Sequence, residues 1–399
     1  MERLVPTIQH YDWGDRSFIA SLQSRAPSGE PEAELWMGAH QRSPSMLAHA
    51  GVGLDEAIAR DPVATLGSSV HQAFGALPFL AKILASAHPL SIQTHPSTAQ
   101  AQAGFDRENR LGIPRMSPNR VYPDPSHKPE LLCALTPFEA KCGFRPLDDA
   151  RALFDLLGGS ADRDRQLGLI IERLAQPGAG CDVYHDVLAW LLRGGTPVDE
   201  LVAATVRAAA AAGDGPFRRE LTWCAPIAAR HPGDVGVVVG LLLNHVALDP
   251  GQAMFLGAGN LHSYLRGAGV ELMANSDNVI RGGLTSKHVD VEELLSVVDT
   301  TPAEPVVQHA SGPLQRFDAP VADFSLTRVA LADPVRIEIA GAEIVIVTVG
   351  SAVLVDHLGA SLLAACGAPV WVPASYRGFV ISGSGSAYRA GVGLLPARS

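Results

Sequence analysis

A change of sequence pattern near residue 147 constrains the fold of this chain more than any other feature. Before it, short apolar runs such as LPFLAKILA and LSIQTH alternate with Pro and Gly, which is typical of strands separated by turns. Between 147 and 230, stretches such as PLDDARALFDLLGG and TPVDELVAATVRAAAAAG carry apolar residues at helical spacing. Strand-like sequence returns at GDVGVVVGLLLNHVAL and continues to about residue 290. The pattern predicts a β unit that is interrupted by a helical insertion.

The length of 399 residues exceeds what one ordinary hydrophobic core organises, so we expect several packed units. Residues 1–146 and 231–312 are predicted to be two parts of one β unit, with 147–230 as the helical insertion. Residues 313–399 contain further short strands with turn signals, such as VRIEIAGAEIVIVTVG, which is typical of a small antiparallel barrel or jelly roll. Short helices are expected at GLDEAIARDP and DVEELLSVVDT. The predicted fold class is therefore mainly β with a helical insertion.

Charge and cysteine usage narrow the classes of partner. The formal net charge is -10 and no dense Lys/Arg run occurs, which argues against nucleic acid or a membrane surface as the main partner. The five cysteines are scattered, without a C-x-x-C pair, so neither a disulfide framework nor a thiolate zinc site is expected. The N-terminal sequence lacks the apolar stretch of a signal peptide, and the longest apolar run is too short to cross a bilayer. A cytoplasmic enzyme or binding protein for a small molecule is predicted, as a monomer or alternatively a homodimer.

Two polar residues interrupt the apolar run PLSIQTH. Gln93 and His95 are two positions apart, so a strand would direct both side chains to one face. A polar pair that projects inward from an apolar strand costs several kcal/mol unless a partner satisfies it. A buried His is more often a satisfied core residue than a ligand, so this pair by itself does not decide the matter.

Further polar residues stand beside two later apolar runs. YPDPSHKPELLCAL places Lys128 and Glu130 where the chain enters an apolar run, and His262 follows a Gly-rich turn. Each segment alone reads as an ordinary loop before a strand. Together with Gln93 and His95, they supply two imidazoles, a carboxylate and an amide oxygen, a plausible ligand set for zinc.

The segment SDNVIRGGLTSK adds Asp277, Arg281 and Lys287. Taken alone, it reads as a polar turn. Beside a metal site, its two cations and Lys128 would suit a phosphate group and a developing oxyanion. The segment therefore adds a small anionic ligand to the hypothesis.

Several separated stretches resemble the signatures of type I mannose-6-phosphate isomerases. They are ELWMGAH, PLSIQTHP, YPDPSHKPELLCALTPFEAKCGFRP and GNLHSYL together with GVELMANSDNVIRGGLT. The resemblance begins at YDWG, residues 11–14, and runs to about residue 295 with the helical insertion left out. It implies a cupin-type β-barrel or jelly-roll catalytic domain, a helical domain and a C-terminal cupin-like β domain.

The resemblance also implies a set of site residues. One Zn²⁺ per chain would be held by Gln93, His95, Glu130 and His262. The positions matching catalytic or other active-site residues are Arg281, Lys128, His127 and Asp277, and those matching the sugar-phosphate site are Ser91, Lys82, Lys287 and Glu271. The chain departs from the family pattern at Ser126, where Asn is common, and at Gly282, where Ala is common.

The implied reaction interconverts mannose 6-phosphate and fructose 6-phosphate through a cis-enediol. The general base stays open among Lys128, His127, Glu271 and a metal-bound water. Two alternatives are a cupin oxygenase, which Gln93 and the surrounding cations argue against, and a binding module without turnover, which the intact site positions argue against. The product could enter glycolysis or GDP-mannose biosynthesis.

Overall fold

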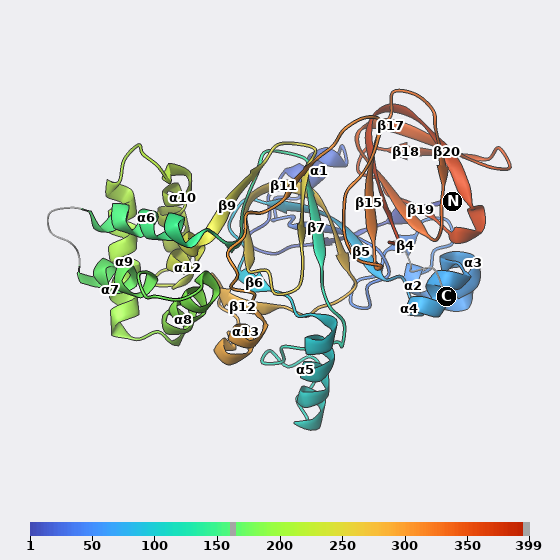
Figure 1. Cartoon of the computed structure of the whole chain (residues 1–399). Coiled ribbons are helices and arrows are strands. Elements are labelled where there is room, and N and C mark those ends of the chain that lie inside the picture. Colours follow the sequence, from blue (N-terminus) through green and yellow to red (C-terminus); the bar gives the residue numbers. More distant parts are fainter. Residues whose placement is uncertain (160–164, 394–399) are drawn as a thin grey trace.

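The computed structural model describes residues 1–159 and 165–393 and contains two antiparallel sheets and a group of helices. The helices of residues 147–242 lie at one end, a central sheet lies in the middle, and a second sheet lies at the other end (Figure 1). Residues 160–164 of the expected insertion and 394–399 of the expected C-terminal unit lie outside the described residues. Among the described residues, no helix combines the length and apolar character needed to span a membrane.

The central sheet has eleven strands and is built around its longest strand, β11. β11 pairs with β5 and β7 over its second half and with β6 and β8 near its start. The strands are β2 Thr7–Gln9, β3 Glu34–Met37, β5 Phe79–Ser86, β6 Ile92–Thr94, β7 Glu130–Ala134, β8 Phe138–Phe144, β9 Leu243–Leu248, β10 Gln252–Leu256, β11 His262–Ala274, β12 Ile280–Gly283 and β13 Val307–His309.

Alternation along β3 and β5 gives the central sheet one apolar and one charged face. Leu35 and Ile83 pack in the core that this sheet shares with the second sheet. Trp36 and Lys82 are direct cross-strand partners, so both side chains lie on the opposite face. The strand pattern therefore turns charged side chains away from the apolar core and toward a common space.

The helical region is longer than predicted. It comprises α6 Leu147–Gly158, α7 Arg165–Leu174, α8 Gly180–Arg193, α9 Thr196–Ala211, α10 Arg218–Thr222, α11 Cys224–Arg230 and α12 Gly236–Leu242. The strand expected at VGVVVGLL is wrong, because Gly236–Leu242 forms α12 and β9 begins only at Leu243. Every residue of α12 is buried, and a fully buried apolar run has no periodicity that separates helix from strand. The other unit boundaries stay predictions.

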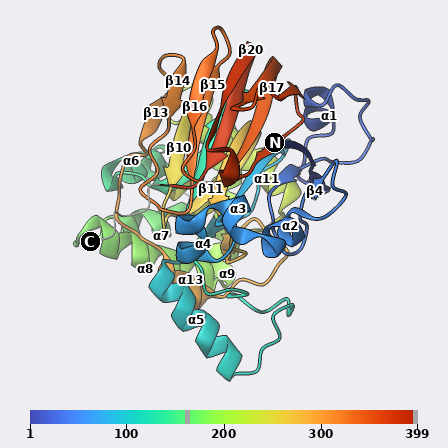
Figure 2. The same cartoon turned by 90° about the vertical axis from the view of Figure 1, so that its right-hand side faces the viewer.

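The second sheet has nine strands and includes the N-terminus of the chain. Its strands are β1 Glu2–Val5, β4 Met46–Leu47, β14 Leu314–Arg316, β15 Ser325–Ala330, β16 Val335–Glu338, β17 Glu343–Asp356, β18 Ser361–Ala365, β19 Val370–Val372 and β20 Gly378–Gly391. β1 pairs with β19, so an N-terminal strand completes a sheet that the sequence assigned only to the C-terminal residues. Figure 2 shows β14, β15, β20 and β17 side by side.

Six further helices lie outside the helical region: α1 Phe18–Leu22, α2 Leu54–Arg60, α3 Pro62–Leu66, α4 Ser68–Phe74, α5 Thr98–Arg110 and α13 Val291–Val297. A 3-10 turn spans Ala374–Tyr376. α2 and α13 confirm the two short helices predicted from the sequence. α5 begins with a capping box between Ser97 and Gln100, which fixes the chain direction directly after His95. The mainly β fold with a helical insertion is confirmed.

Candidate metal centre and its cavity

Three buried side chains at the ends of three strands converge on one point. His95 follows β6, Glu130 begins β7 and His262 begins β11, and their ligand atoms lie within 4.8 Å of one another. Glu130 Oε1 is 3.3 Å from His95 Nε2, and Glu130 Oε2 is 3.5 Å from His262 Nε2. These are nitrogen and oxygen donors of the kind that zinc prefers.

The outer nitrogen of each imidazole is held by a backbone carbonyl. His95 Nδ1 lies 2.8 Å from the Asn278 oxygen, and His262 Nδ1 lies 3.0 Å from the Asn260 oxygen. A carbonyl can only accept, so Nδ1 carries the proton and the Nε2 lone pair faces Glu130. This arrangement is usual for histidines that bind a metal.

The protonation states of the cluster also suit a cation. Burial, with the nearby Lys128 ammonium adding to it, lowers the pKa of His95 to about 4, so the imidazole is neutral at pH 7. Burial would raise the pKa of Glu130, but the Lys128 ammonium beside it outweighs burial and holds that pKa well below its ordinary value. Among the described residues, Glu130 Oε2 and His262 Nε2 are buried without a hydrogen-bond partner. A metal ion would satisfy both atoms, so the residues fit a zinc site.

Gln93 stands beside this cluster in a three-strand ladder. Its backbone pairs with His262 on β11 and with Arg281 on β12, and directly paired residues direct their side chains to the same face. β6 ends at Thr94, so His95 lies just beyond the strand in which the sequence analysis had placed it. The ladder brings an amide and a guanidinium to the side of the sheet where His262 lies.

A cavity of about 790 Å³ opens over the cluster and is lined by most of the predicted site residues. These are Lys82, Ser91, Gln93, Lys128, Glu130, Glu271, Asp277, Arg281 and Lys287. His95 and His262 are each 1% exposed and are not part of the lining. Lys128 Nζ donates a hydrogen bond to Glu130 Oε1, which places a cation between the cluster and the cavity.

Lys82 is held between two carboxylates on the cavity side of the central sheet. Its Nζ lies 3.2 Å from Glu271 Oε2 and 3.5 Å from Glu34 Oε1, and 5.4 Å from the centre of the Trp36 ring. Burial would lower the pKa of Lys82, but Glu34 and Glu271 raise it overall, so the ammonium stays charged. Burial raises the pKa of Glu271, with Lys82 opposing. Sequence reasoning missed Glu34 and Trp36, although their alternation with Leu35 in ELWM was a usable signal.

Arg281 and Lys287 are the two cations of the predicted site that line the cavity and are free to take an anion. Among the described residues, neither side chain has a hydrogen-bond or ion-pair partner. Burial lowers the pKa of Arg281. Burial and the charges of Arg281 and Arg42 lower the pKa of Lys287. A bound anion would relieve this repulsion between cations.

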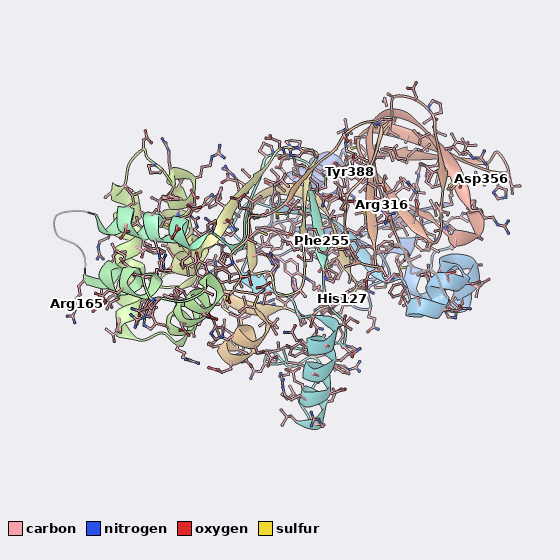
Figure 3. The ribbon with its side chains drawn as sticks, in the orientation of Figure 1. His127, Arg165, Phe255, Arg316, Asp356 and Tyr388 are labelled. Carbon is pink, nitrogen blue, oxygen red and sulfur yellow. The ribbon has the colours of Figure 1, made fainter. Side chains whose placement is uncertain are left out.

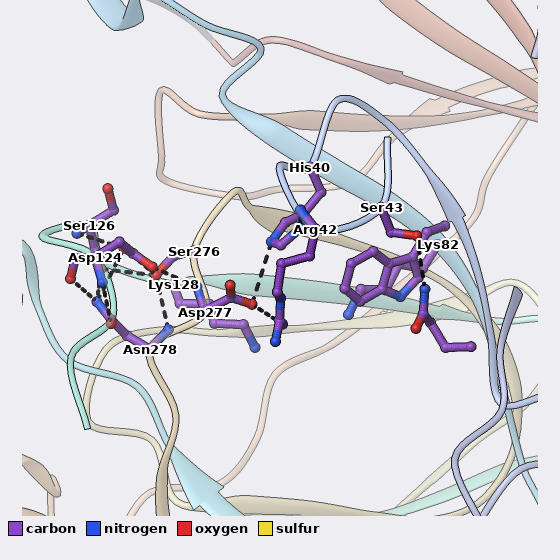
Figure 4. A network of polar contacts seen from close by, with 12 residues as sticks. His40, Arg42, Ser43, Lys82, Asp124, Ser126, Lys128, Ser276, Asp277 and Asn278 are labelled. Carbon is purple, nitrogen blue, oxygen red and sulfur yellow. Dashed lines mark hydrogen bonds and ion pairs between the residues drawn. The ribbon is translucent and has the colours of Figure 1, made fainter. Parts of the chain in front are cut away.

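Asp277 and His127 take different positions. Asp277 lines the cavity and pairs with Arg42 at 2.5 Å and with His40 Nε2 at 3.4 Å (Figure 4). His127, labelled in Figure 3, is not among the lining residues, and its Nε2 lies 2.9 Å from Asp323 Oδ2. The structure therefore brings Asp277 into the cavity and leaves His127 outside it.

The two departures from the family pattern lie close to this site. Only backbone atoms of Ser126 take part in the local hydrogen bonds, so the side chain there is not used. A Cβ added at Gly282 would lie 3.0 Å from Cδ2 of the buried Leu294, so that side chain would have to move by a few tenths of an ångström. Gly283 is different, because it has a φ of 143° and a Cβ there would lie 3.0 Å from the Gly236 backbone of α12.

Comparison with known proteins gives consistent matches. Residues 1–147 match the family model described as phosphomannose isomerase type I, catalytic domain. The mannose-6-phosphate isomerase of Salmonella typhimurium is 38% identical over 336 residues, covering 82% of this chain and 83% of that protein. The protein of the same name from Escherichia coli is 38% identical over 342 residues, with 84% of each chain covered. A crystal structure of a zinc-bound mannose 6-phosphate isomerase is similar with a TM-score of 0.89 and 35% identity, covering 98% of this chain and 99% of that one.

Proposed function

Because the chain belongs to the type I mannose-6-phosphate isomerase family, we propose that its cavity interconverts mannose 6-phosphate and fructose 6-phosphate. The fold is the expected cupin-type β fold with a helical domain. The single observation that carries the proposal is the buried cluster of His95, Glu130 and His262 beside a cavity that is lined by Arg281 and Lys287, two cations without a partner among the described residues. An isomerase of this kind needs both a site for adjacent sugar oxygens and a site for phosphate.

The metal site would be formed by His95, Glu130 and His262, with the Gln93 amide oxygen as a fourth ligand. Zinc fits because the two imidazoles are oriented by carbonyls and because two buried atoms of the cluster have no hydrogen-bond partner in the part of the chain that the structure describes. When bound, the ion supplies Lewis acidity toward substrate oxygens. A neutral amide ligand keeps the total ligand charge low, which preserves that acidity.

Different cations of the cavity would contact different groups of the substrate. Arg281 lies next to Gln93 across the β6–β12 pair, so its guanidinium would stabilise the negative charge that develops on the enediol oxygens. Lys287, further along the same segment, would bind the phosphate, with the Ser91 hydroxyl as a further donor. Lys82 is already paired with two carboxylates, so its predicted contact with phosphate needs a rearrangement of that group.

Proton transfer between C1 and C2 needs a base that reaches the cavity. Lys128 and Glu271 line the cavity and His127 does not, so we place the base at one of these two residues or at a metal-bound water. Burial raises the pKa of Glu271, so its carboxylate is a stronger base than an ordinary carboxylate. Solvent exchange at C2, followed in Glu271→Gln and Lys128→Met, would identify which side chain moves the proton.

The decisive experiment is a coupled assay of fructose 6-phosphate formation from mannose 6-phosphate. It should be run on purified protein, after chelation, and after zinc is added back. We expect turnover to vanish with the chelator and to return with zinc. Turnover that survives thorough metal removal would exclude a zinc enzyme, whereas zinc-loaded protein that binds mannose 6-phosphate without turnover would favour a binding module.

The cellular setting is part of the same proposal. We propose a cytoplasmic enzyme that acts as a monomer on a small sugar phosphate, without nucleic acid or membrane as a partner. Its product would supply either GDP-mannose biosynthesis or glycolysis. Light scattering after size exclusion tests the monomer, and sugar-phosphate levels in cells lacking the protein test the direction: accumulated mannose 6-phosphate indicates use of mannose, and depleted mannose 6-phosphate indicates supply for GDP-mannose.

A further inference from the structure

We propose that Asp124 and Asn278 are positioning residues that set the zinc affinity of the site by holding the carbonyl that orients His95. The proposal rests on the metal site of the proposed function. Neither side chain belongs to the predicted metal or substrate ligands. Both belong to a hydrogen-bonded network that joins the loop before β7 to the turn before β12 (Figure 4).

Asn278 is wholly buried and works through both its backbone and its side chain. Its carbonyl oxygen lies 2.8 Å from His95 Nδ1. Its side-chain amide donates hydrogen bonds to the carbonyl oxygens of Asp124 at 2.8 Å and Ser126 at 2.7 Å. Because the amide is fixed at two points, the peptide that presents the carbonyl to His95 is fixed as well.

The Asp124 carboxylate closes the network from the other side. It accepts hydrogen bonds from Ser126 N at 3.0 Å, from Ser276 Oγ at 2.9 Å and from Asp277 N at 2.8 Å. Hydrogen bonds to an ionised carboxylate are stronger than those between neutral groups. One side chain therefore fixes two segments that are far apart in the sequence.

Both segments lead directly to the metal site. The Asp124 loop continues into Lys128 and Glu130, and the turn fixed by Asp277 N carries the Asn278 carbonyl. Loss of the network would leave His95 free to turn about its side-chain bonds, because its Nδ1 would lose a fixed acceptor. Removing such a partner from a metal-binding His typically weakens metal binding by about 10–100-fold.

Two substitutions test the network, and one neighbour serves as a control. Asp124→Asn keeps the size of the side chain and removes its charge, while Asn278→Ala removes both amide donors. We expect each to raise the zinc dissociation constant by about 10–100-fold. Ser126→Ala should leave it unchanged, because Ser126 contributes only backbone atoms.

The measurement is a zinc competition titration of the apo-protein against a chromophoric chelator, with circular dichroism to check folding. If Asn278→Ala does not fold, Ser276→Ala offers a milder variant. It removes a hydroxyl that contacts the Asp124 carboxylate, the Ser126 carbonyl and Asn278 N, and it leaves the side-chain amide of Asn278 in place. Unchanged zinc affinity in folded Asp124→Asn would overturn the proposal. Wild-type protein without any zinc affinity would instead overturn the proposed function.

A second readout separates orientation of His95 from general loosening. Nuclear magnetic resonance of the histidine side chains should show protected Nδ1 protons on both His95 and His262 in the wild type. In Asp124→Asn the His95 proton should exchange faster, while the His262 proton, held by Asn260, should stay protected. Equal loss of both signals would mean that the network acts only through overall stability, and the proposal would fail.

Discussion

The two β units of this protein differ in what fills their interiors. The second sheet encloses a set of fully buried aliphatic side chains, which includes Val329, Leu331, Val345, Val347, Leu354 and Ile381. The cavity side of the central sheet instead carries buried ionisable side chains, namely Lys82, His95, Lys128, Glu130, His262 and Glu271. Both sheets are antiparallel, so architecture alone does not show which of them carries the candidate active site and which has only a packed core.

A buried carboxylate in each unit makes the difference concrete. Glu343 in the second sheet accepts two hydrogen bonds from Arg389, at 2.9 Å and 2.5 Å, which closes the pair. Glu130 in the central sheet has one oxygen without a hydrogen-bond partner among the described residues. A closed pair supports the fold, whereas an open carboxylate beside two imidazoles is arranged for a ligand that comes from outside.

Glu130→Gln should give the largest effect on activity. The substitution removes a charged zinc ligand, and the lost stabilisation of several kcal/mol corresponds to a fall in kcat/KM of about 10³-fold or more. The coupled assay measures it, with zinc content determined on the same sample. Near-normal turnover with zinc still bound would contradict the assignment of Glu130 as a metal ligand, and with it the contrast to Glu343.

Glu343→Gln is the matched change in the other unit and should act on stability alone. It leaves the largely buried Arg389 guanidinium without its counter-charge, at a cost of about 3–5 kcal/mol in the free energy of unfolding. Denaturant titration measures this cost, and kcat of the protein that stays folded should equal that of the wild type. A fall in kcat would show that the second sheet takes part in the reaction.

Arg281→Ala and Lys287→Ala sharpen the comparison within the cavity. Removing a group that stabilises developing charge should lower kcat by about 10²–10³-fold, so Arg281→Ala is expected in that range. Lys287→Ala should mainly raise KM, because phosphate binds in the ground state and in the transition state alike. Steady-state kinetics of both variants distinguishes the roles, and a rise in KM alone for Arg281→Ala would contradict its assignment.

Lys141 is a buried lysine outside the cavity, and its burial should lower the stability of the protein. It lies opposite His245 across the β8–β9 pair, is 2% exposed, and its Nζ has no hydrogen-bond partner among the described residues. We expect Lys141→Met to raise the free energy of unfolding at pH 7 by about 1–3 kcal/mol, because the unsatisfied group disappears.

The stability difference between Lys141→Met and the wild type should depend on pH. Burial, with Arg145 adding to it, lowers the pKa of Lys141 from 10.5 to about 7. Below pH 7 the lysine is charged in the folded and unfolded states, so the full burial cost applies; the cost fades as pH rises toward 10.5. The advantage of Lys141→Met over the wild type should therefore shrink between pH 7 and pH 10. An advantage that grows with pH would contradict it.

The sequence picked out residues that the structure brings together, but it did not show the connections around them. Gln93, His95, Glu130 and His262 stood out because polar side chains beside apolar runs need a reason to be there, and resemblance supplied one. The contact between the Asn278 carbonyl and His95 could not be predicted from the sequence, because every residue type has a backbone oxygen. Helix α12 and the pairing of β1 with β19 were missed because burial and long-range pairing decide them, and neither is written in local periodicity.

The most direct test of the central claim is a crystal structure of zinc-loaded protein, with anomalous diffraction recorded on both sides of the zinc absorption edge. We expect one anomalous peak, within bonding distance of His95 Nε2, His262 Nε2, Glu130 and the Gln93 amide oxygen, and no peak in the second sheet. A peak at other residues, or no peak in crystals of protein that turns over mannose 6-phosphate, would contradict the claim that the buried charges of the central sheet form a zinc site.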